Sequence, residues 1–512
     1  MKASKLFNVS LGVIFITMIS IPLITVNRTA GQISVAENRA LASFPSLKTV
    51  EGTFNTQIIK EYEAWFNDNL GFRDEFLKLN TSLQYKLFGN LTRTDTIVGK
   101  NDWLYYVTPE IIKDYQHLNL PTSQQLELWG DSFKLINEYL DEKDIPFITM
   151  INLDKKTIYP ENYPSSIYKI GEVSRTDILV DYLSSKEKLD IFTPKKALFE
   201  AKKLQTLYSP RYDNAHWNNY GAFIGYLELM ERVKKYYPNI KILSWDDFEI
   251  TPYEREFNLY DVVRFKETDY AFKLKKESNA VQIKDKFKDL NLIHSDLSVS
   301  YTNKDPNLPK VLILGDSYLY NFLTPYISES FSEMNFIYTD NINRLKSFIE
   351  LYNPDIVIYE NVERMLDGTL PSIVESSESF KSYNSYVNLP VSSNPSFWLD
   401  YSNGEFVKSQ NEVEVDTSKK LTNFVGWALD SQEMSTATNV FLKVGNKYYS
   451  GEYGLPRPSV SEYFNNSNLY NSGFSININT EELIDAGEIE FIIISKDKEH
   501  QYKPIKIKIV EK

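Results

Sequence analysis

The sequence predicts an α/β fold with a mostly parallel sheet covered by helices on both faces, followed by an all-β module. From about residue 120, short apolar strands alternate with amphipathic helical segments, which is the pattern of βαβ units. The aliphatic run over residues 310–314 leads directly into Gly315-Asp316-Ser317 and a further helical segment. After Asn411 the pattern changes to short alternating strands separated by turns, which indicates a β-sandwich.

The predicted elements of the α/β region follow one another with few interruptions. Pro121-Thr122-Ser123 is typical of a helix start, and that helix runs to about residue 140. Apolar residues recur at helical spacing over residues 218–236. The other predictions are strands at 145–151, 189–192, 311–314, 336–338 and 355–359, and helices at 318–331 and 344–352. Residues 245–308 are polar and irregular, with strand-like pieces, and are interpreted as an insertion.

The N-terminal segment predicts a membrane anchor. Lys2 and Lys5 precede residues 6–26, which carry no charge and match the roughly 20 residues that span a bilayer core. Positive charge before the span places the N-terminus inside, so we expect a single-pass protein of the cell membrane with its bulk extracytoplasmic. A cleaved signal peptide is the alternative, although we see no convincing small-x-small cleavage site after Val26.

Composition excludes several function classes. The 512 residues carry a formal net charge of −13, and no dense run of Lys and Arg is interleaved with aromatic residues, so nucleic acid is not expected as a partner. The chain has no cysteine, which excludes disulfides, thiolate metal sites and a Cys nucleophile. Its four histidines are far apart in sequence and form no metal-binding pattern. We therefore expect neither a metal nor a cofactor.

These patterns divide the chain into four parts. Residues 1–30 are the predicted transmembrane anchor or signal, 31–370 the α/β domain, 371–410 a linker and 411–512 the β-sandwich module. The linker is predicted because its residues are rich in Ser, Asn and Pro and low in periodicity.

Ser317 and His216 are the strongest candidates for chemistry. Ser317 follows an apolar strand and begins a helix, where α/β enzymes expose a nucleophile and where its backbone N–H can stabilise an oxyanion. Asp213-Asn214-Ala215-His216-Trp217 places a carboxylate three residues before a histidine, a spacing that lets Asp213 orient the imidazole. Each motif alone also fits turn and cap residues or a solvated loop. Together they predict a Ser-His-Asp arrangement and acyl-transfer chemistry.

Further motifs occur across residues 35–370. They are Glu37-Asn38-Arg39 with Phe44-Pro45, Trp65-Phe66-Asn67-Asp68 with Phe72-Arg73-Asp74, and segments 99–105, 154–160 and 354–364. With the serine and histidine motifs, they resemble the SGNH-hydrolase-like family typified by the alginate O-acetyltransferases AlgX and AlgJ, and especially its DHHW group. The resemblance implies an SGNH-like three-layer sandwich around a parallel sheet.

By this resemblance Ser317 is the nucleophile and His216 the base, with the histidine motif preceding the serine motif as in the family. The family usually has Asp two residues before the histidine, and this chain has Asn214 there. Asp213 is one residue further away, a spacing that ordinary SGNH esterases use, so it is the expected third member. The alternative is an impaired triad.

Four other residues are weaker candidates. Asp316 is expected to shape the turn beside the nucleophile rather than to react. Asn361 and Arg364 are candidates for oxyanion or substrate contacts, with structural pairing, such as Arg364 with Glu360, as the alternative. Lys155 is a further candidate for such contacts, with a structural role as the alternative.

The resemblance implies an extracytoplasmic O-acetyltransferase that moves an acetyl group, through an acyl-enzyme on Ser317, onto hydroxyls of a cell-surface or exported polysaccharide. The expected acetyl donor is a multi-spanning membrane O-acyltransferase. A carbohydrate acetyl esterase with the same residues is the first alternative. The second is a non-catalytic scaffold or glycan-binding protein of an envelope complex, which the departure at Asn214 keeps open.

Overall fold

A seven-stranded sheet forms the centre of the computed structural model, which describes residues 2–27, 33–34, 39–48, 52–284, 287 and 292–512. The strand order is β6-β5-β13-β11-β12-β10-β9. The bounds are β5 (Phe147–Asn152), β6 (Ile191–Phe192), β9 (Ala280–Ile283), β10 (Val299–Asn303), β11 (Lys310–Gly315), β12 (Glu333–Tyr338) and β13 (Ile356–Val362). The first five strands in this order, β6, β5, β13, β11 and β12, are parallel to one another, and β10 and β9 are antiparallel to their neighbours. The mixed α/β class predicted from the sequence is confirmed.

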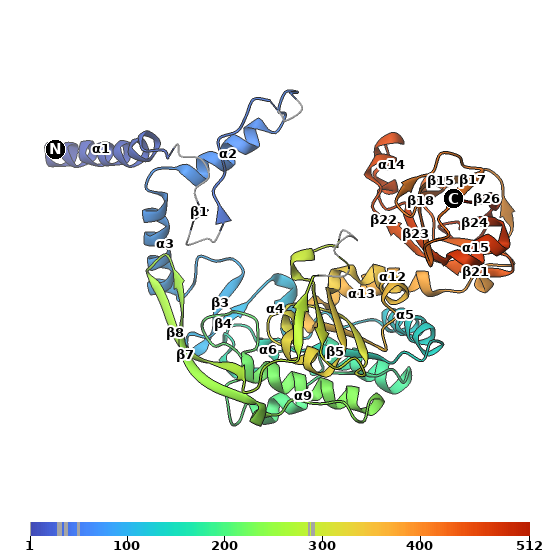
Figure 1. Ribbon diagram of the computed structural model, residues 1–512. Helices are drawn as coiled ribbons and strands as arrows, with labels where there is room; N and C mark the ends of the chain where they lie inside the picture. The colour runs from blue at the N-terminus through green and yellow to red at the C-terminus, as the bar shows by residue number, and fades with distance from the viewer. Residues whose placement is uncertain (1, 28–32, 35–38, 49–51, 285–286, 288–291) are drawn as a thin grey trace.

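Helices cover both faces of this sheet (Figure 1). On one face, Ile148, Ile313 and Ile358 pack with α8, α9, α10 and α11. On the other face, Leu312 and Val357 pack with α5, α7, α12 and α13. The bounds are α5 (Ser123–Asp141), α7 (Arg175–Asp181), α8 (Lys195–Ala201), α9 (Asn219–Tyr236), α10 (Ser317–Tyr320), α11 (Thr324–Ile327), α12 (Leu345–Tyr352) and α13 (Leu366–Ser377). Side chains that point alternately to the two faces of the buried strands thus fill two cores, one on each side of the sheet. Truncating one of these apolar side chains to Ala is expected to lower the free energy of unfolding by about 2–5 kcal/mol.

The helix predicted over residues 318–331 is broken into three short helices. These are α10, α11 and a 3₁₀ turn over Ser328–Ser330. Pro325 explains the break, because it has no N–H to continue the first helix but fits the first turn of a new one.

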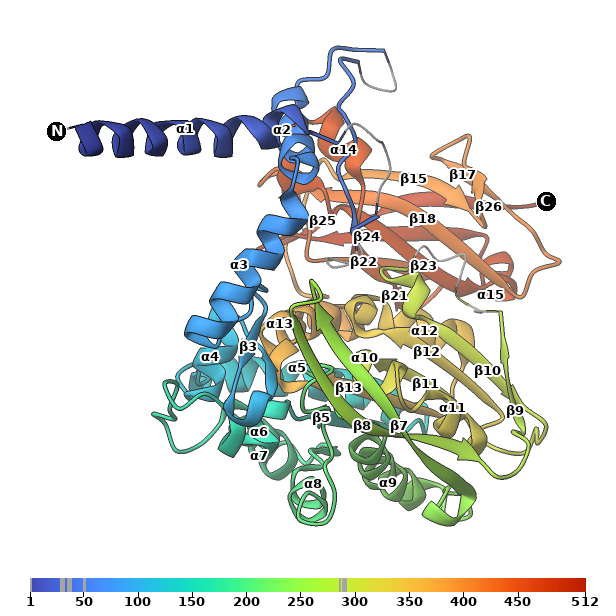
Figure 2. The ribbon, with the colours of Figure 1, turned by 90° about the vertical axis from the view of Figure 1, so that its left-hand side faces the viewer.

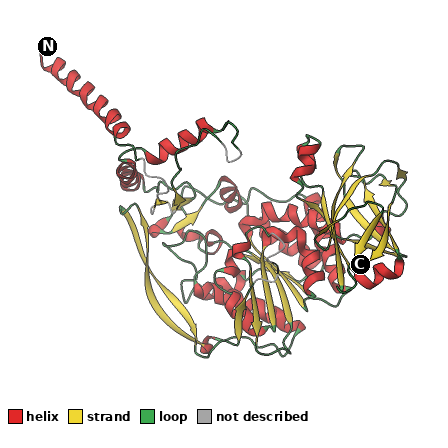
Figure 3. Ribbon diagram, turned by 45° about the horizontal axis from the view of Figure 1, so that its top comes forward, coloured by secondary structure: helices red, strands yellow, loops and turns green. Residues whose placement is uncertain are grey.

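The segment interpreted as an irregular insertion contains a long hairpin and two strands of the central sheet. The hairpin pairs β7 (Phe248–Leu259) with β8 (Val263–Leu274) over their whole length (Figure 3). The connection between the paired residues Leu259 and Val263 is three residues long, and its first two residues, Tyr260 and Asp261, have the positive φ of 53° and 60° that tight hairpin turns use. Strands β9 and β10 extend the parallel sheet at its edge.

The segment predicted as a linker begins with a packed helix. Helix α13 continues to Ser377, and its residues Leu366, Leu370 and Ile373 are buried in the core. Helical periodicity in this stretch is hidden by Pro371 and by the surrounding serines. Further along, β14 (Val391–Ser392) and β15 (Ser396–Ser402) already belong to the C-terminal sheets.

Two facing sheets form the C-terminal sandwich, which lies beside α12 and α13 (Figure 2). One sheet has the order β14-β25-β24-β20-β21, with β26 and β17 attached to β24, and the other has the order β16-β15-β18-β23-β22, with β19 attached to β18. The bounds are β16 (Glu405–Phe406), β17 (Glu412–Val415), β18 (Leu421–Asp430), β19 (Ser435–Thr436), β20 (Asn439–Val444), β21 (Lys447–Ser450), β22 (Glu452–Leu455), β23 (Gly473–Asn479), β24 (Glu488–Ile494), β25 (Gln501–Tyr502) and β26 (Ile505–Glu511). Helices α14 (Pro458–Tyr463) and α15 (Thr480–Ala486) connect strands of this module.

The N-terminal region is helical and projects from the rest of the molecule (Figure 1). Its elements are α1 (Lys2–Ile24), β1 (Ile33–Ser34), β2 (Arg39–Ala40), α2 (Ile58–Asn69) and α3 (Arg73–Phe88). The hairpin of β3 (Thr96–Val98) and β4 (Leu104–Tyr106), with α4 (Pro109–Tyr115) and α6 (Lys155–Ile158), lies against the α/β region (Figure 1). Among the described residues, no helix has the length and apolar character needed to cross a membrane. The predicted membrane anchor is therefore not confirmed.

Candidate active site

Ser317 stands at the carboxyl edge of the central sheet, as the first residue of α10 directly after β11. The Asp316 carboxylate accepts hydrogen bonds from the backbone N–H groups of Tyr318 (2.8 Å) and Val362 (2.7 Å). The backbone N–H of Asp316 in turn donates to Glu360 Oε2 at 2.9 Å. These bonds tie the turn to β13 and leave the Ser317 side chain half-buried at the surface of the sheet edge.

His216 lies between Ser317 and Asp213. Its Nε2 is 2.8 Å from Ser317 Oγ, and its Nδ1 is 3.0 Å from Asp213 Oδ2. Asp213 Oδ1 accepts the backbone N–H groups of Ala215 (2.7 Å) and His216 (2.8 Å), which closes a tight turn. An Nδ1–H that donates to the carboxylate leaves Nε2 as the acceptor of the serine hydroxyl proton. The structure thus brings all three predicted site residues within hydrogen-bond distance.

Asp213 is ionised at neutral pH. Burial alone raises the pKa of its carboxyl, but the hydrogen bond and charge of His216 and the charge of Lys155 outweigh burial and hold that pKa well below its usual range. Its side chain is 32% exposed and that of His216 is 19% exposed, so solvent reaches both.

Asn214, the departure from the family pattern, faces away from His216. Its Nδ2 donates to Thr96 Oγ1 at 2.6 Å, and its carbonyl accepts the backbone N–H of Tyr106 at 2.7 Å. Asn214 therefore joins the histidine loop to the β3–β4 hairpin, and the carboxylate that contacts His216 comes from Asp213.

Lys155 holds the loop that carries Asp213 and His216 through backbone carbonyls. Its Nζ donates to the backbone carbonyl of Leu104 at 2.8 Å and to that of Asp213. The residue is 1% exposed, and burial lowers the pKa of its ammonium to about 7. Lys155 thus contacts the site through the backbone of Asp213 rather than through reacting atoms.

Glu267 on β8 holds the beginning of the same loop, and no sequence motif pointed to it. Its carboxylate accepts from the Ser209 hydroxyl (2.8 Å) and from the backbone N–H groups of Arg211 (2.7 Å) and Tyr212 (3.1 Å). The available signal was the period-two alternation of β8, which puts Glu267 on the same face as the apolar Val263 and Phe265.

Arg364 supports the site indirectly, and Asn361 lies apart from it. Arg364 pairs with Asp154 rather than with Glu360, and its Nη1 lies 3.4 Å from the Tyr318 hydroxyl. That hydroxyl donates to the backbone carbonyl of Ala215 at 2.9 Å, next to His216. Asn361 is fully buried and accepts a hydrogen bond from the Thr369 hydroxyl at 3.3 Å.

Asp316 and Glu360 form a buried acid pair beneath Ser317, with exposures of 1% and 0%. Burial raises the pKa of both carboxyls, and the negative charge of Asp316 raises the pKa of Glu360 further. Backbone N–H bonds and the charge of Arg364 oppose this rise at Asp316. The one negative charge of the pair is therefore expected on Asp316, with Glu360 protonated.

Comparison with known proteins gives structural likeness at low identity. No protein-family model and no curated protein matches the chain. PatB1 of Bacillus cereus is 16% identical, with 54% of this chain and 98% of that chain covered and a TM-score of 0.41. A DHHW family protein of Eubacterium siraeum is 12% identical, covering 55% and 96%, with a TM-score of 0.39. The O-acetyltransferase domain of AlgJ from Pseudomonas putida is 13% identical, covering 56% and 99%, with a TM-score of 0.34. The last two carry the names of groups that the sequence motifs resemble.

Proposed function

We propose that this chain is an extracytoplasmic O-acetyltransferase that works through a serine acyl-enzyme. The observation that supports it most is the chain of contacts from Ser317 Oγ to His216 Nε2 (2.8 Å) and from His216 Nδ1 to Asp213 (3.0 Å). In this proposal Ser317 is the nucleophile, His216 the general base and Asp213 the group that orients the imidazole.

Acylation begins when the Ser317 hydroxyl gives its proton to His216 Nε2 and Oγ attacks the carbonyl carbon of the acetyl donor. The carbonyl electrons move to the oxygen, and the backbone N–H of Ser317 at the start of α10 stabilises that oxyanion. The intermediate then collapses, the bond to the leaving group breaks, and His216 gives its proton to that group. Asp213 stays ionised throughout and stabilises the imidazolium.

Transfer reverses these steps with a sugar hydroxyl as acceptor. The hydroxyl gives its proton to His216 and attacks the acetyl carbon, and Ser317 leaves and recovers the proton. The acceptor in this proposal is a cell-surface or exported polysaccharide, and the donor is a multi-spanning membrane acyltransferase. Anchoring of the chain by its N-terminal helix is part of the same proposal, and the chemistry does not depend on it.

Esterase activity with water as acceptor is the second candidate. The partial exposure of the His216 and Asp213 side chains supports it, because water that reaches the histidine competes with a sugar hydroxyl. The non-catalytic alternative depended on the loss of the orienting carboxylate at position 214, and Asp213 takes that place beside His216.

The test is acetylation of the purified chain with p-nitrophenyl acetate, followed by intact-mass measurement and by product release with and without oligosaccharide acceptors. We expect a single acetyl adduct in the wild type. Ser317→Ala and His216→Ala are expected to lose the adduct and to reduce release by about 10⁴-fold or more. Ser184→Ala and His294→Ala, at exposed positions, serve as matched controls and are expected to behave as wild type.

Three outcomes separate the candidates. Acetyl transfer to an oligosaccharide supports the transferase. Hydrolysis that added glycans do not change supports the esterase. Equal adduct formation in the wild type and in Ser317→Ala contradicts both.

A further inference from the structure

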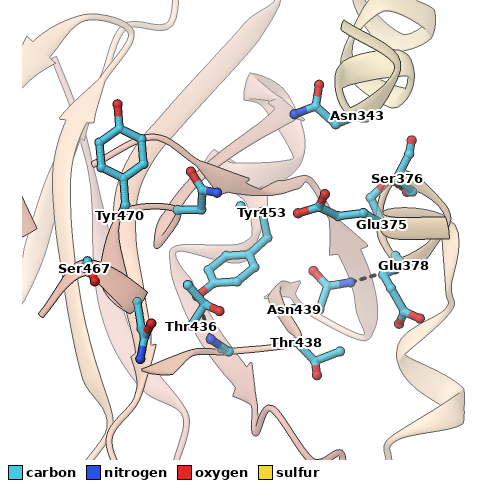
Figure 4. A pocket seen from close by; sticks show the side chains of 15 residues that line it. Asn343, Glu375, Ser376, Glu378, Thr436, Thr438, Asn439, Tyr453, Ser467 and Tyr470 are labelled. Atoms are coloured by element: carbon cyan, nitrogen blue, oxygen red, sulfur yellow. Dashed lines mark hydrogen bonds between the residues drawn. The ribbon is translucent and has the colours of Figure 1, made fainter. Parts of the chain in front are cut away.

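A cavity of about 370 Å³ lies between the α/β region and the C-terminal sandwich. One wall comes from Asn343 and the end of α13, and the other from β20, β22 and the segment around Tyr470 (Figure 4). Its volume falls in the range of about 300–1,000 Å³ that is typical of ligand pockets. None of its lining residues belongs to the site formed by Ser317, His216 and Asp213.

Uncharged hydrogen-bonding groups make up most of the cavity wall. Four Asn side chains and five Ser or Thr hydroxyls line it. The amide of Asn343 points into the cavity, and its buried Oδ1 has no hydrogen-bond partner in the described part of the chain (Figure 4). On the opposite wall, Asn439 is held in place by donating to the backbone carbonyl of Glu378 at 3.0 Å. Amides that are fixed but incompletely bonded offer both donors and acceptors to a ligand.

Two tyrosines add aromatic surface to this polar wall. The Tyr453 hydroxyl donates to the backbone carbonyl of Ala428 at 2.7 Å and accepts the N–H of Ala437 at 2.8 Å, so its ring is rigid. Tyr470 is 48% exposed at the mouth of the cavity. A rigid ring and an exposed ring among amides suit the flat, C–H-rich faces of sugar rings, whose hydroxyls the amides can bond.

The charges of the cavity disfavour an anionic ligand. Among the described residues, Glu375 and Glu378 are the only charged ones that line it, and none of the lining residues is Lys, Arg or His. Glu378 is neutralised by Lys381 (2.8 Å) and Lys498 (3.1 Å), whereas Glu375 is exposed. A uronate or phosphate chain would bring negative charge against Glu375 with no cation to balance it.

We propose that this cavity binds an uncharged segment of a glycan chain. Fixed amides, hydroxyls and tyrosine rings recognise the sugar, and the unbalanced carboxylate selects against acidic polysaccharides. The proposal deepens the proposed function, and rests on it in one respect: if Ser317 transfers acetyl groups, the cavity holds a neutral acceptor chain.

The experiment uses the full chain on an array of neutral oligosaccharides built from hexoses, deoxyhexoses and N-acetylhexosamines, with oligogalacturonate as the anionic probe. Hits are then titrated calorimetrically. We expect at least one neutral oligosaccharide to bind at least about 10-fold more tightly than oligogalacturonate. Tyr470→Ala is expected to weaken that binding about 10-fold, and Tyr463→Ala, 84% exposed on neighbouring α14, to leave it unchanged.

A charge reversal tests the selectivity. Glu375→Lys is expected to narrow the preference for neutral chains by raising affinity for oligogalacturonate about 10-fold, and Glu462→Lys, exposed outside the cavity, to have no such effect. No binding to any neutral glycan, equal binding of oligogalacturonate by the wild type, or binding unaffected by Tyr470→Ala overturns the proposal. Ser317→Ala is expected to bind the same glycan as the wild type, so failure of catalysis and failure of this site are distinguishable.

Discussion

Two adjacent residues, Asp213 and Asn214, have different roles in the same loop. Asp213 contacts the imidazole of His216, and Asn214 bonds Thr96 of the β3–β4 hairpin. A carboxylate and an amide of nearly equal size differ chiefly in charge, and only the carboxylate stabilises a histidine that has taken up a proton.

Asp213→Asn is expected to reduce kcat of acetyl release by about 10³- to 10⁴-fold, because the amide neither fixes the productive tautomer nor balances the imidazolium. The double variant Asp213→Asn with Asn214→Asp is expected to stay equally inactive, since position 214 faces Thr96. Steady-state kinetics with p-nitrophenyl acetate measures both.

Asn214→Asp alone is the matched control and is expected to keep activity within about 10-fold of wild type, because Asp213 is intact. The new carboxylate loses the bond that the Asn214 amide donates to Thr96, since the Thr96 hydroxyl already donates to Asp95 at 2.9 Å. Recovery of activity in the double variant would mean that position 214 can orient His216.

At the scale of elements, the loop that carries His216 is held by three neighbours. Lys155 on α6 donates to the backbone carbonyl of Asp213. Glu267 on β8 accepts from backbone N–H groups at the beginning of the loop, and Asn214 donates to the β3–β4 hairpin. The position of His216 against Ser317 thus depends on elements from before and after it in the chain.

Lys155→Met is expected to reduce kcat about 100-fold with little change in KM, because the carbonyls of Leu104 and Asp213 lose their donor and the histidine shifts from Ser317. Burial keeps the pKa of Lys155 near 7, so the wild type is also expected to show a change in kcat around that pH which the variant lacks.

Lys203→Met, whose side chain is 63% exposed and paired with Glu200, provides the control for removal of one positive charge. Unchanged kcat and an unchanged pH profile in Lys155→Met would show that the buried ammonium has no part in positioning the loop.

At the scale of the whole molecule, buried polar groups join the α/β region to the sandwich. Lys346 on α12 donates to the backbone carbonyl of Ser379 at 3.0 Å and also to the Ser450 hydroxyl on β21. Arg344 pairs with Glu452 on β22 at 3.3 Å, and Glu452 is 1% exposed. Because a buried charge is tolerated only when it is paired, this contact is sensitive to protonation.

Burial raises the pKa of Glu452 from 4.5 to about 7, against the opposing charge of Arg344. The folded state therefore holds a proton that the unfolded state releases between these values. The resulting stability is present below about pH 4.5 and is lost as pH rises through about 7, by about 3 kcal/mol.

Urea unfolding at intervals from pH 4.5 to 8 measures this loss. Glu452→Gln is expected to flatten the profile by about 3 kcal/mol, and Glu499→Gln, at an exposed position, to reproduce the wild-type slope. Parallel profiles for wild type and Glu452→Gln would place the pH dependence elsewhere.

Local patterns were enough to predict most of the central sheet. The strands at β5, β11 and β13 were expected from apolar runs, and α9 from its helical spacing, because these signals are written in consecutive residues. The break after α10 and the helix α13 were missed, since a proline and several serines obscured the periodicity there.

The sequence by itself determined which residue types are present for acyl chemistry and the order of the serine and histidine motifs. The motifs also predicted that Ser317, His216 and Asp213 act together, and the structure places them in contact. Only the tertiary structure decided that Asn214 bonds Thr96 and that Lys155 and Glu267 hold the loop. The cavity between the α/β region and the sandwich was likewise decided only by the tertiary structure. The physical reason is that side-chain partners are selected by packing between distant segments, and no short stretch of sequence records which segments will meet.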